Sequence, residues 1–211
     1  MNNPVTLAQI NNEKSLSAKG QKRIASILAT AGKVLAEHGP EDFSVNRVAA
    51  EAGISLGNLQ YYFPKKKDLM YALLNNMFQP WIAQLEQAVT EQADAECDKQ
   101  LLRHMLELAF VSNTSNENCA VVWNCTAMSL YDDEVLSMLN EWYVLFRHLL
   151  AKGVKRYNPK LSKQQIESIS LFITATIEGQ AMIWRHTAPD RRKLNKMNKD
   201  FIDYVLQLVE D

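Results

Sequence analysis

The residue types that could perform chemistry are concentrated in residues 55–67, SLGNLQYYFPKKK. Asn58 and Gln60 carry amide groups that can each form two hydrogen bonds with the edge of an adenine. Three consecutive lysines, residues 65–67, follow a proline, and their ammonium groups can bind phosphate. Base-reading amides beside phosphate-binding cations indicate a nucleic-acid interface.

The position of these lysines supports the same interpretation. They stand at the start of an expected helix, where each opposes the helix dipole at a cost of a few tenths to about 1 kcal/mol. A phosphate bound there makes the arrangement favourable, because the unpaired N–H groups and the ammonium groups both attract it. Lys66 is the candidate contact, whereas Lys65 and Lys67 are equally well explained as solvated charges.

The sequence predicts no catalytic residue and no cofactor. It lacks a G-x-S-x-G elbow, a glycine-rich phosphate loop, an H-E-x-x-H motif and a paired-carboxylate motif. His104 and Glu107 could share one helix face, but no third ligand stands at matching spacing, so no metal is expected. Cys97, Cys119 and Cys125 are odd in number and lack a C-x-x-C pair, which favours buried thiols.

Composition and charge are those of an ordinary globular protein. Of the 211 residues, 47% are hydrophobic and 22% are charged, with a net charge of −1. Residues 13–68 nevertheless carry a charge of +3, and the remainder carries −4. No apolar run is long enough to cross a bilayer, and the start lacks a cationic segment followed by an apolar one. We therefore expect a cytoplasmic protein without a membrane partner.

The elements that hold these residues are predicted to be short helices. Ser44 is expected to cap one helix, which Gly53 ends, and Ser55 is expected to cap a second helix, which Pro64 closes. Leu59 should face inward, leaving Gly57 and its polar neighbours on the outer surface. Two short helices joined by such a turn predict a helix-turn-helix.

The rest of the chain is also predicted to be helical. An amphipathic helix through Ile24 and Leu35 should stop at Gly39-Pro40. Further helices are expected over 65–92, with a kink at Pro80, and then over 98–112, 119–130, 132–157, 162–187 and 190–209. No alternating pattern predicts a strand, so the fold should be all-α with about nine helices. We divide it into a flexible tail (1–13), a helix-turn-helix domain (14–64) and a C-terminal domain (65–211), with the helix from residue 65 linking the two.

The segment FSVNRVAAEAGISLGNLQYYFPKKKDLMYALL closely resembles the DNA-binding domain of TetR-family bacterial transcription regulators. The resemblance covers residues 19–74 and rests on the following residues at the family's spacing: Val48, Ala49, Ala52, Gly53, Ile54, Ser55, Gly57, Leu59, Tyr61, Tyr62, Phe63, Lys66 and Leu69. It implies a double-stranded DNA operator as the partner. Beyond residue 74 it rests only on helix number and length.

The resemblance also implies roles for individual residues. Ser44, Tyr62 and Lys66 match phosphate-binding positions. Positions that approach bases are matched by Leu56, Gly57, Asn58 and Tyr61. Gln60 departs from the family pattern, which usually has tyrosine, and Lys65 stands where Ser or Thr would be typical. We count Asn46, Arg47, Ser55 and Gln60 as further candidate DNA contacts.

The recognition helix lacks one common base contact. No Arg or Lys lies between Ser55 and Tyr62, so the usual guanine contact is missing. Our hypothesis is an operator with important A·T pairs, read by Asn58 and Gln60 and by apolar contacts with thymine methyl groups.

The last two helices are the expected homodimer surface, because one recognition helix reads only a few base pairs. TetR-like proteins pair these helices into a four-helix bundle. The apolar residues concerned are Leu171, Ile173, Ile177, Ala181, Ile183 and Trp184, followed by Phe201, Tyr204, Val205, Leu208 and Val209. The alternative is that these residues form only the core within one chain.

Aromatic and methionine side chains gather where the family keeps its effector pocket. The candidates for ligand binding are Trp81, Met105, Phe110, Trp123, Met128, Trp142 and Phe146, with Tyr131 and Tyr143 in the same region. They suit a small apolar or aromatic molecule, although such residues are also typical of plain core. Polar groups that could orient the ligand are Arg103, Arg147, His148, Glu178 and Arg185.

The sequence therefore predicts a ligand-responsive DNA-binding repressor that binds a palindromic operator as a homodimer and is released by its effector. An activator of the same fold and a helical protein-binding adaptor are the alternatives.

Overall fold

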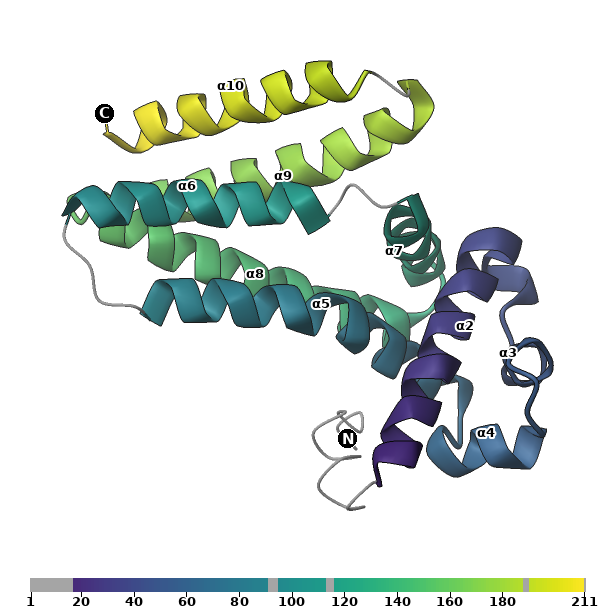
Figure 1. The fold of residues 1–211 in the computed structure, drawn as a ribbon. Helices are drawn as coiled ribbons and strands as arrows, with labels where there is room; N and C mark the ends of the chain where they lie inside the picture. Colours follow the sequence, from purple (N-terminus) through teal and green to yellow (C-terminus); the bar gives the residue numbers. More distant parts are fainter. Residues whose placement is uncertain (1–16, 91–94, 113–115, 188–189, 211) are drawn as a thin grey trace. The chain divides into compact units, whose positions relative to one another are not determined.

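The computed structural model describes residues 17–90, 95–112, 116–187 and 190–210, which form nine α-helices and no strand (Figure 1). The helices are α2 (Ala18–Asp42), α3 (Val45–Glu51), α4 (Leu56–Tyr62), α5 (Lys66–Thr90), α6 (Ala95–Ser112), α7 (Asn116–Ser129), α8 (Asp133–Tyr157), α9 (Lys163–Thr187) and α10 (Arg191–Glu210). The predicted all-α fold is confirmed. The expected tail, residues 1–13, lies outside the described residues.

The predicted stop at Gly39-Pro40 appears as a break inside α2. Gly39 has φ 76° and ψ −178°, which interrupts the helical backbone before Pro40. Glycine tolerates this conformation because it has no Cβ. The chain then turns at Phe43, whose buried ring lies directly before the N-cap of α3.

The chain divides into two compact units that are not continuous in sequence. The first contains residues up to Gln79 together with Ala120–Asn140, and the second contains Pro80–Cys119 and Glu141–Asp211. Helices α5, α7 and α8 therefore each contribute residues to both units. The functional division after residue 64 that the sequence suggests stays a prediction.

The first unit is built around the apolar face of α2. The helix buries residues at the i, i+3, i+4 spacing of an amphipathic helix: Ile24, Ile27, Leu28, Ala31, Val34 and Leu35. α2 packs on α3, and α3 packs on α4. On α7, the Asn124 side chain donates a hydrogen bond to the Leu35 carbonyl (2.6 Å), and the Cys125 thiol lies 3.7 Å from the Met70 sulfur.

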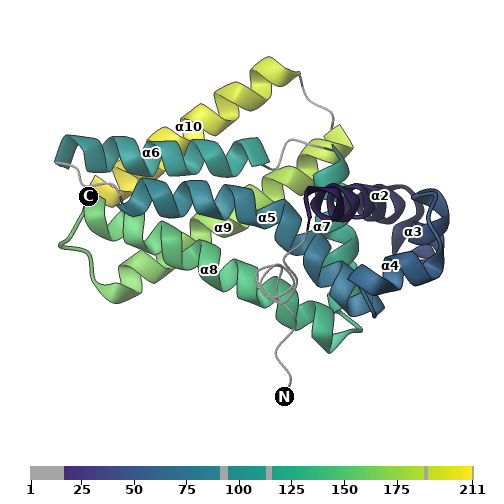
Figure 2. The same cartoon turned by 60° about the horizontal axis from the view of Figure 1, so that its bottom comes forward.

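The second unit has its own core, formed by α6, the end of α5, most of α8, α9 and α10. α10 packs against α6 and α9 (Figures 1 and 2). Gly153 of α8 allows a close approach to α6, because a Cβ at this position would lie 2.7 Å from the Met105 sulfur. Near the end of α8, Arg156 forms an ion pair with Asp98 of α6 (2.6 Å).

Two of the three predicted buried thiols are confirmed. Cys119 and Cys125 are buried thiols that form no disulfide, whereas the Cys97 side chain lies outside the described residues. Burial raises the pKa of the Cys125 thiol to about 12, so this group is not a ready nucleophile. Among the described residues, no helix combines the length and apolar character needed to span a membrane.

Candidate nucleic-acid interface

Local hydrogen bonds fix both ends of α3. The Ser44 hydroxyl accepts a hydrogen bond from the Arg47 amide (3.2 Å) and caps the N-terminus, as predicted. At the other end, the amide of Gly53 bonds to the Ala50 carbonyl and that of Ile54 to the Ala49 carbonyl, at 3.1 and 3.0 Å. This is a Schellman turn, and it needs the positive φ of Gly53 (64°).

After this turn α4 begins, and Ser55 is its N-cap. The Ser55 hydroxyl accepts a hydrogen bond from the Asn58 amide (3.2 Å). Leu59 is completely buried and anchors the helix to the first unit. The opposite face is exposed and consists of Gly57, Asn58, Gln60 and Tyr61. The predicted orientation of this helix is therefore confirmed, and Tyr61 keeps 57% of its surface exposed.

The three lysines at the start of α5 have different surroundings. Lys67 forms an ion pair with Glu134 of α8 within the first unit (2.9 Å). The Lys66 ammonium lies 5.6 Å from the centre of the Phe43 ring, which leaves it at the exposed surface. Of the two, Lys66 is better placed to meet a phosphate, because no carboxylate among the described residues pairs with its ammonium.

Asp68 supplies a helix cap that the sequence patterns above do not include. Its carboxylate accepts a hydrogen bond from the Lys65 amide (3.0 Å), one turn back along the chain. A negative charge in the first turn also offsets the lysines in the field of the helix dipole. The signal was the spacing Lys65-x-x-Asp68, which resembles the second half of a capping box.

The remaining candidate DNA contacts differ in their exposure and in the partners they already have. Asn46 is exposed, and Ser44 is half-buried with its hydroxyl oxygen engaged in the helix cap. Arg47 forms ion pairs with Asp42 and Glu51, both at 3.1 Å. Because Arg47 would have to exchange these partners for a phosphate, its predicted DNA contact requires a rearrangement.

The predicted ligand residues divide between the two units. Trp123 and Met128 belong to the first, and the other five belong to the second: Trp81, Met105, Phe110, Trp142 and Phe146. Met105, Phe110 and Phe146 are buried in the second unit's core. The Trp81 and Phe146 rings lie 4.7 Å apart between centres. Tyr131, named with this group, is 92% exposed at the end of α7.

Exposed apolar side chains gather on α9 and α10, where the dimer surface was predicted. On α9 they are Leu171, Phe172, Met182 and Ile183, and on α10 they are Met197 and Tyr204. Ile173, Ile177, Ala181, Val205 and Val209, which the sequence also assigned to this surface, are buried in the core of the same chain. The Trp184 side chain lies outside the described residues.

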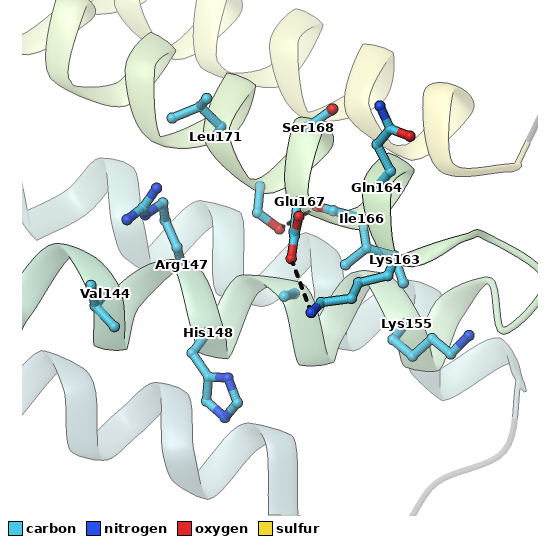
Figure 3. Close-up of a pocket in the computed structure, with 12 residues that line it drawn as sticks. Val144, Arg147, His148, Lys155, Lys163, Gln164, Ile166, Glu167, Ser168 and Leu171 are labelled. Carbon is cyan, nitrogen blue, oxygen red and sulfur yellow. Dashed lines mark hydrogen bonds and ion pairs between the residues drawn. The ribbon is translucent and has the colours of Figure 1, made fainter.

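A groove of about 760 Å³ runs between α8 and α9 in the second unit (Figure 3). Arg147, His148, Lys155 and Lys163 make its lining basic. Lys163 pairs with Glu167 at 3.7 Å, and Lys155 donates to the Pro159 and Leu161 carbonyls. The groove is thus a basic surface whose cations mostly have weak or backbone partners.

Two capped short helices, a Schellman turn between them and an exposed polar face on the second define a helix-turn-helix domain. Residues 27–73 match the family described as bacterial regulatory proteins, tetR family. The helix-turn-helix domain of this chain belongs to that family.

Relatives and solved structures agree with this assignment. The chain is 28% identical over 96 residues to the fatty acid metabolism regulator protein of Bacillus subtilis, covering 46% of this chain and 48% of that one. A TetR-family structure from Rhodococcus sp. superposes with a TM-score of 0.67 at 19% identity, covering 90% and 97% of the two chains. A regulator structure from Saccharomonospora viridis in complex with choline superposes with a TM-score of 0.66 at 18% identity, covering 90% and 95%.

The sequence match and the structural match cover different shares of the chain. The matched sequence spans about half the length of the first curated relatives, whereas the structural similarity extends over most of the chain and establishes the fold. The curated relatives carry the names of regulators, and none of those cited above is named as an enzyme.

Proposed function

We propose that this chain is a DNA-binding transcriptional repressor that binds a palindromic operator as a homodimer and is released by a small effector. The observation that carries the proposal is the exposed face of α4, where Gly57, Asn58, Gln60 and Tyr61 project from a helix anchored by Leu59. A helix presented in this way fits the major groove, where base edges can be distinguished. Lys66 and Tyr62 flank it as phosphate contacts.

The direct test is a gel-shift or anisotropy titration against the DNA upstream of the gene, at several salt concentrations. Lys66→Ala should weaken binding to all sequences. It should also reduce the slope of log affinity against log salt by about two, because a dimer loses two phosphate contacts.

Lys67→Ala is the matched control. Lys67 is paired with Glu134, so we expect its removal to change the salt slope less. Equal slopes for wild type and Lys66→Ala would contradict the role of Lys66. Failure of the wild type to prefer any DNA sequence would contradict the proposed function and favour the protein-binding adaptor.

The homodimer is supported by the exposed apolar residues of α9 and α10. Leu171 and Met182 are exposed apolar residues on one surface of α9, and a second copy of the chain can bury them. Two recognition helices then read half-sites about one turn of DNA apart. Selected binding sites should be palindromic, with A·T pairs at the positions that Asn58 and Gln60 contact.

The effector is proposed to act through the second unit. Helix α5 contributes Lys66–Gln79 to the first unit and Pro80–Thr90 to the second, so a ligand that prefers one arrangement of α5 can alter DNA binding. The choline complex of the Saccharomonospora viridis regulator supports a small-molecule effector. A transcriptional reporter decides between repression and activation.

A further inference from the structure

The groove between α8 and α9 carries a positive charge that the second unit as a whole lacks (Figure 3). That unit, Pro80–Cys119 and Glu141–Asp211, holds 14 lysines and arginines against 15 aspartates and glutamates. The groove lining holds the cations Arg147, Lys155 and Lys163 together with His148, against the single carboxylate of Glu167. Cations gathered in a concave site attract an anion more strongly than the same charges spread over a convex surface.

One face of each helix forms a wall of this groove, because residues at the i, i+3, i+4 spacing point the same way. The wall residues are Val144, Arg147, His148, Ala151 and Lys155 on α8, and Lys163, Gln164, Glu167, Ser168 and Leu171 on α9. Ile166 and Ser170 also line the groove and are buried, and the Ser170 hydroxyl donates to the Ile166 carbonyl (2.8 Å). Polar recognition of a ligand therefore has to come from the two walls.

Arg147 is held in a way that leaves its charge available. Its Nε donates to the Tyr143 backbone carbonyl, one turn back along α8 (3.3 Å), which restricts the side chain. No carboxylate among the described residues pairs with the guanidinium. A carbonyl does not neutralise a charge, so the other N–H groups of Arg147 can bind a carboxylate or phosphate through two parallel hydrogen bonds.

Lys155 is held in a similar way further along α8. Its ammonium donates to the Pro159 and Leu161 carbonyls (2.8 and 3.3 Å), and no described carboxylate pairs with it. Lys163 differs, because it lies 3.7 Å from Glu167 with 92% of its side chain exposed, and an exposed pair of this kind contributes little. The groove thus contains two cations, Arg147 and Lys155, that are positioned by backbone carbonyls and lack a described counter-ion.

Apolar surface lies beside these cations. Val144 on α8 and Leu171 on α9 are 58% and 54% exposed, and Figure 3 shows both toward the same end of the groove as Arg147. An organic molecule can bury this surface, whereas a hydrated inorganic ion gains nothing from it. The volume of about 760 Å³ also lies within the range of small-molecule sites.

We propose that the groove between α8 and α9 binds a small organic anion. Arg147 holds its acidic group, with His148 and Ser168 as further hydrogen-bond donors. Its apolar part lies against Val144 and Leu171. The site goes beyond the proposed function, because binding in the groove requires neither DNA nor the aromatic residues of the core.

The test compares an organic anion with a neutral molecule that has the same rings. Anilinonaphthalene sulfonate and phenylnaphthylamine both become fluorescent in apolar surroundings, and only the first is charged. Each is titrated into the full-length protein at constant ionic strength. Arg147→Gln should raise the Kd of the anion at least about tenfold and leave the Kd of the neutral molecule unchanged, since it removes only a charge-assisted contact.

Lys152→Gln is the matched control, because Lys152 is an exposed cation on the same helix that does not line the groove. It should bind the anion as the wild type does. Ser168→Trp places a large ring in the groove and should abolish binding of the anion while keeping the helix content. The proposal is overturned if Arg147→Gln or Ser168→Trp binds the anion as tightly as the wild type, or if Lys152→Gln weakens binding as much as Arg147→Gln.

The same variant separates this site from a contact with DNA or with a second copy of the chain. Arg147→Gln should keep the salt dependence of DNA binding and the association state of the wild type, measured by anisotropy and by analytical ultracentrifugation. A smaller salt slope would assign Arg147 to a DNA phosphate. A changed association state would assign it to a partner copy, and either result overturns the proposal.

Discussion

At the scale of single residues, the partly buried Glu178 carboxylate should destabilise the folded chain at pH values where it is charged. Because burial raises its pKa in the folded state, the fold binds this proton more tightly than the unfolded chain does. The contribution of Glu178 to stability is therefore most favourable below its unfolded pKa and is lost as the pH rises through its folded pKa.

Glu178→Gln removes the charge and keeps the shape. We expect it to raise the free energy of unfolding at pH 8 by on the order of 1 kcal/mol, and by less at pH 5. Urea unfolding at the two pH values measures this, and the difference between variant and wild type isolates Glu178 from other carboxyl groups. An unchanged or lower stability of the variant at pH 8 would contradict the burial argument.

At the scale of elements, two glycines in the helix-turn-helix should respond oppositely to alanine. Gly57 lies inside α4, and no heavy atom stands within 4 Å of the point that a Cβ would occupy, so a methyl group there meets open space. Gly57→Ala should stabilise the fold by up to about 1 kcal/mol through helix propensity. Gly53 has φ 64°, and Gly53→Ala should destabilise the fold by roughly 1 kcal/mol.

Gly57→Ala should also change the affinity for DNA. If α4 enters the major groove, the new methyl of Gly57→Ala stands between the helix backbone and the bases. We expect affinity to fall by about tenfold, or ~1.4 kcal/mol, despite the gain in stability. Urea unfolding and anisotropy on the same samples measure both quantities. Unchanged affinity would show that the backbone at Gly57 does not approach DNA.

The sequence predicted these elements well because their signals are local. Ser44, Ser55 and Gly53 act on backbone groups within a few residues, so their types alone define the ends of the helices. Long-range partners could not be predicted in this way. The pairing of Lys67 with Glu134 joins residues 67 positions apart, and no local pattern distinguishes Lys67 from Lys66.

The same limit applies to the candidate ligand site. Aromatic and methionine residues on helices are equally typical of pockets and of cores, and Met105 and Phe110 are buried in the core. The sequence named Glu178 only as one of several polar groups. Its partial burial depends on how α9 packs within the second unit, which the spacing along the helix does not encode.

At the scale of the whole molecule, the regulation proposed above would require that the two units communicate, and three helices contribute residues to both units. Each of α5, α7 and α8 is continuous across the division of the chain. A change in the second unit can therefore be transmitted through helices rather than through a flexible linker. In the proposed dimer, the spacing of the two recognition helices would then depend on how α9 and α10 of the two copies pack.

Gly179 tests that assembly without disturbing the single chain. It is exposed on α9 between the apolar residues Leu171 and Phe172 on one side and Met182 and Ile183 on the other, and a Cβ there meets nothing within 4 Å. Gly179→Arg should leave the helix content unchanged. It should also convert the dimer into monomers, because a long charged side chain prevents the close approach of two helices.

Analytical ultracentrifugation measures the association state, and circular dichroism measures the helix content. Gln100→Arg, at an exposed position on α6, adds the same single charge and should remain dimeric. Because each monomer carries a single recognition helix, Gly179→Arg should also lose most of its affinity for a palindromic site while keeping weak, salt-sensitive binding. A Gly179→Arg protein that stays dimeric would show that the pairing surface lies elsewhere on the chain.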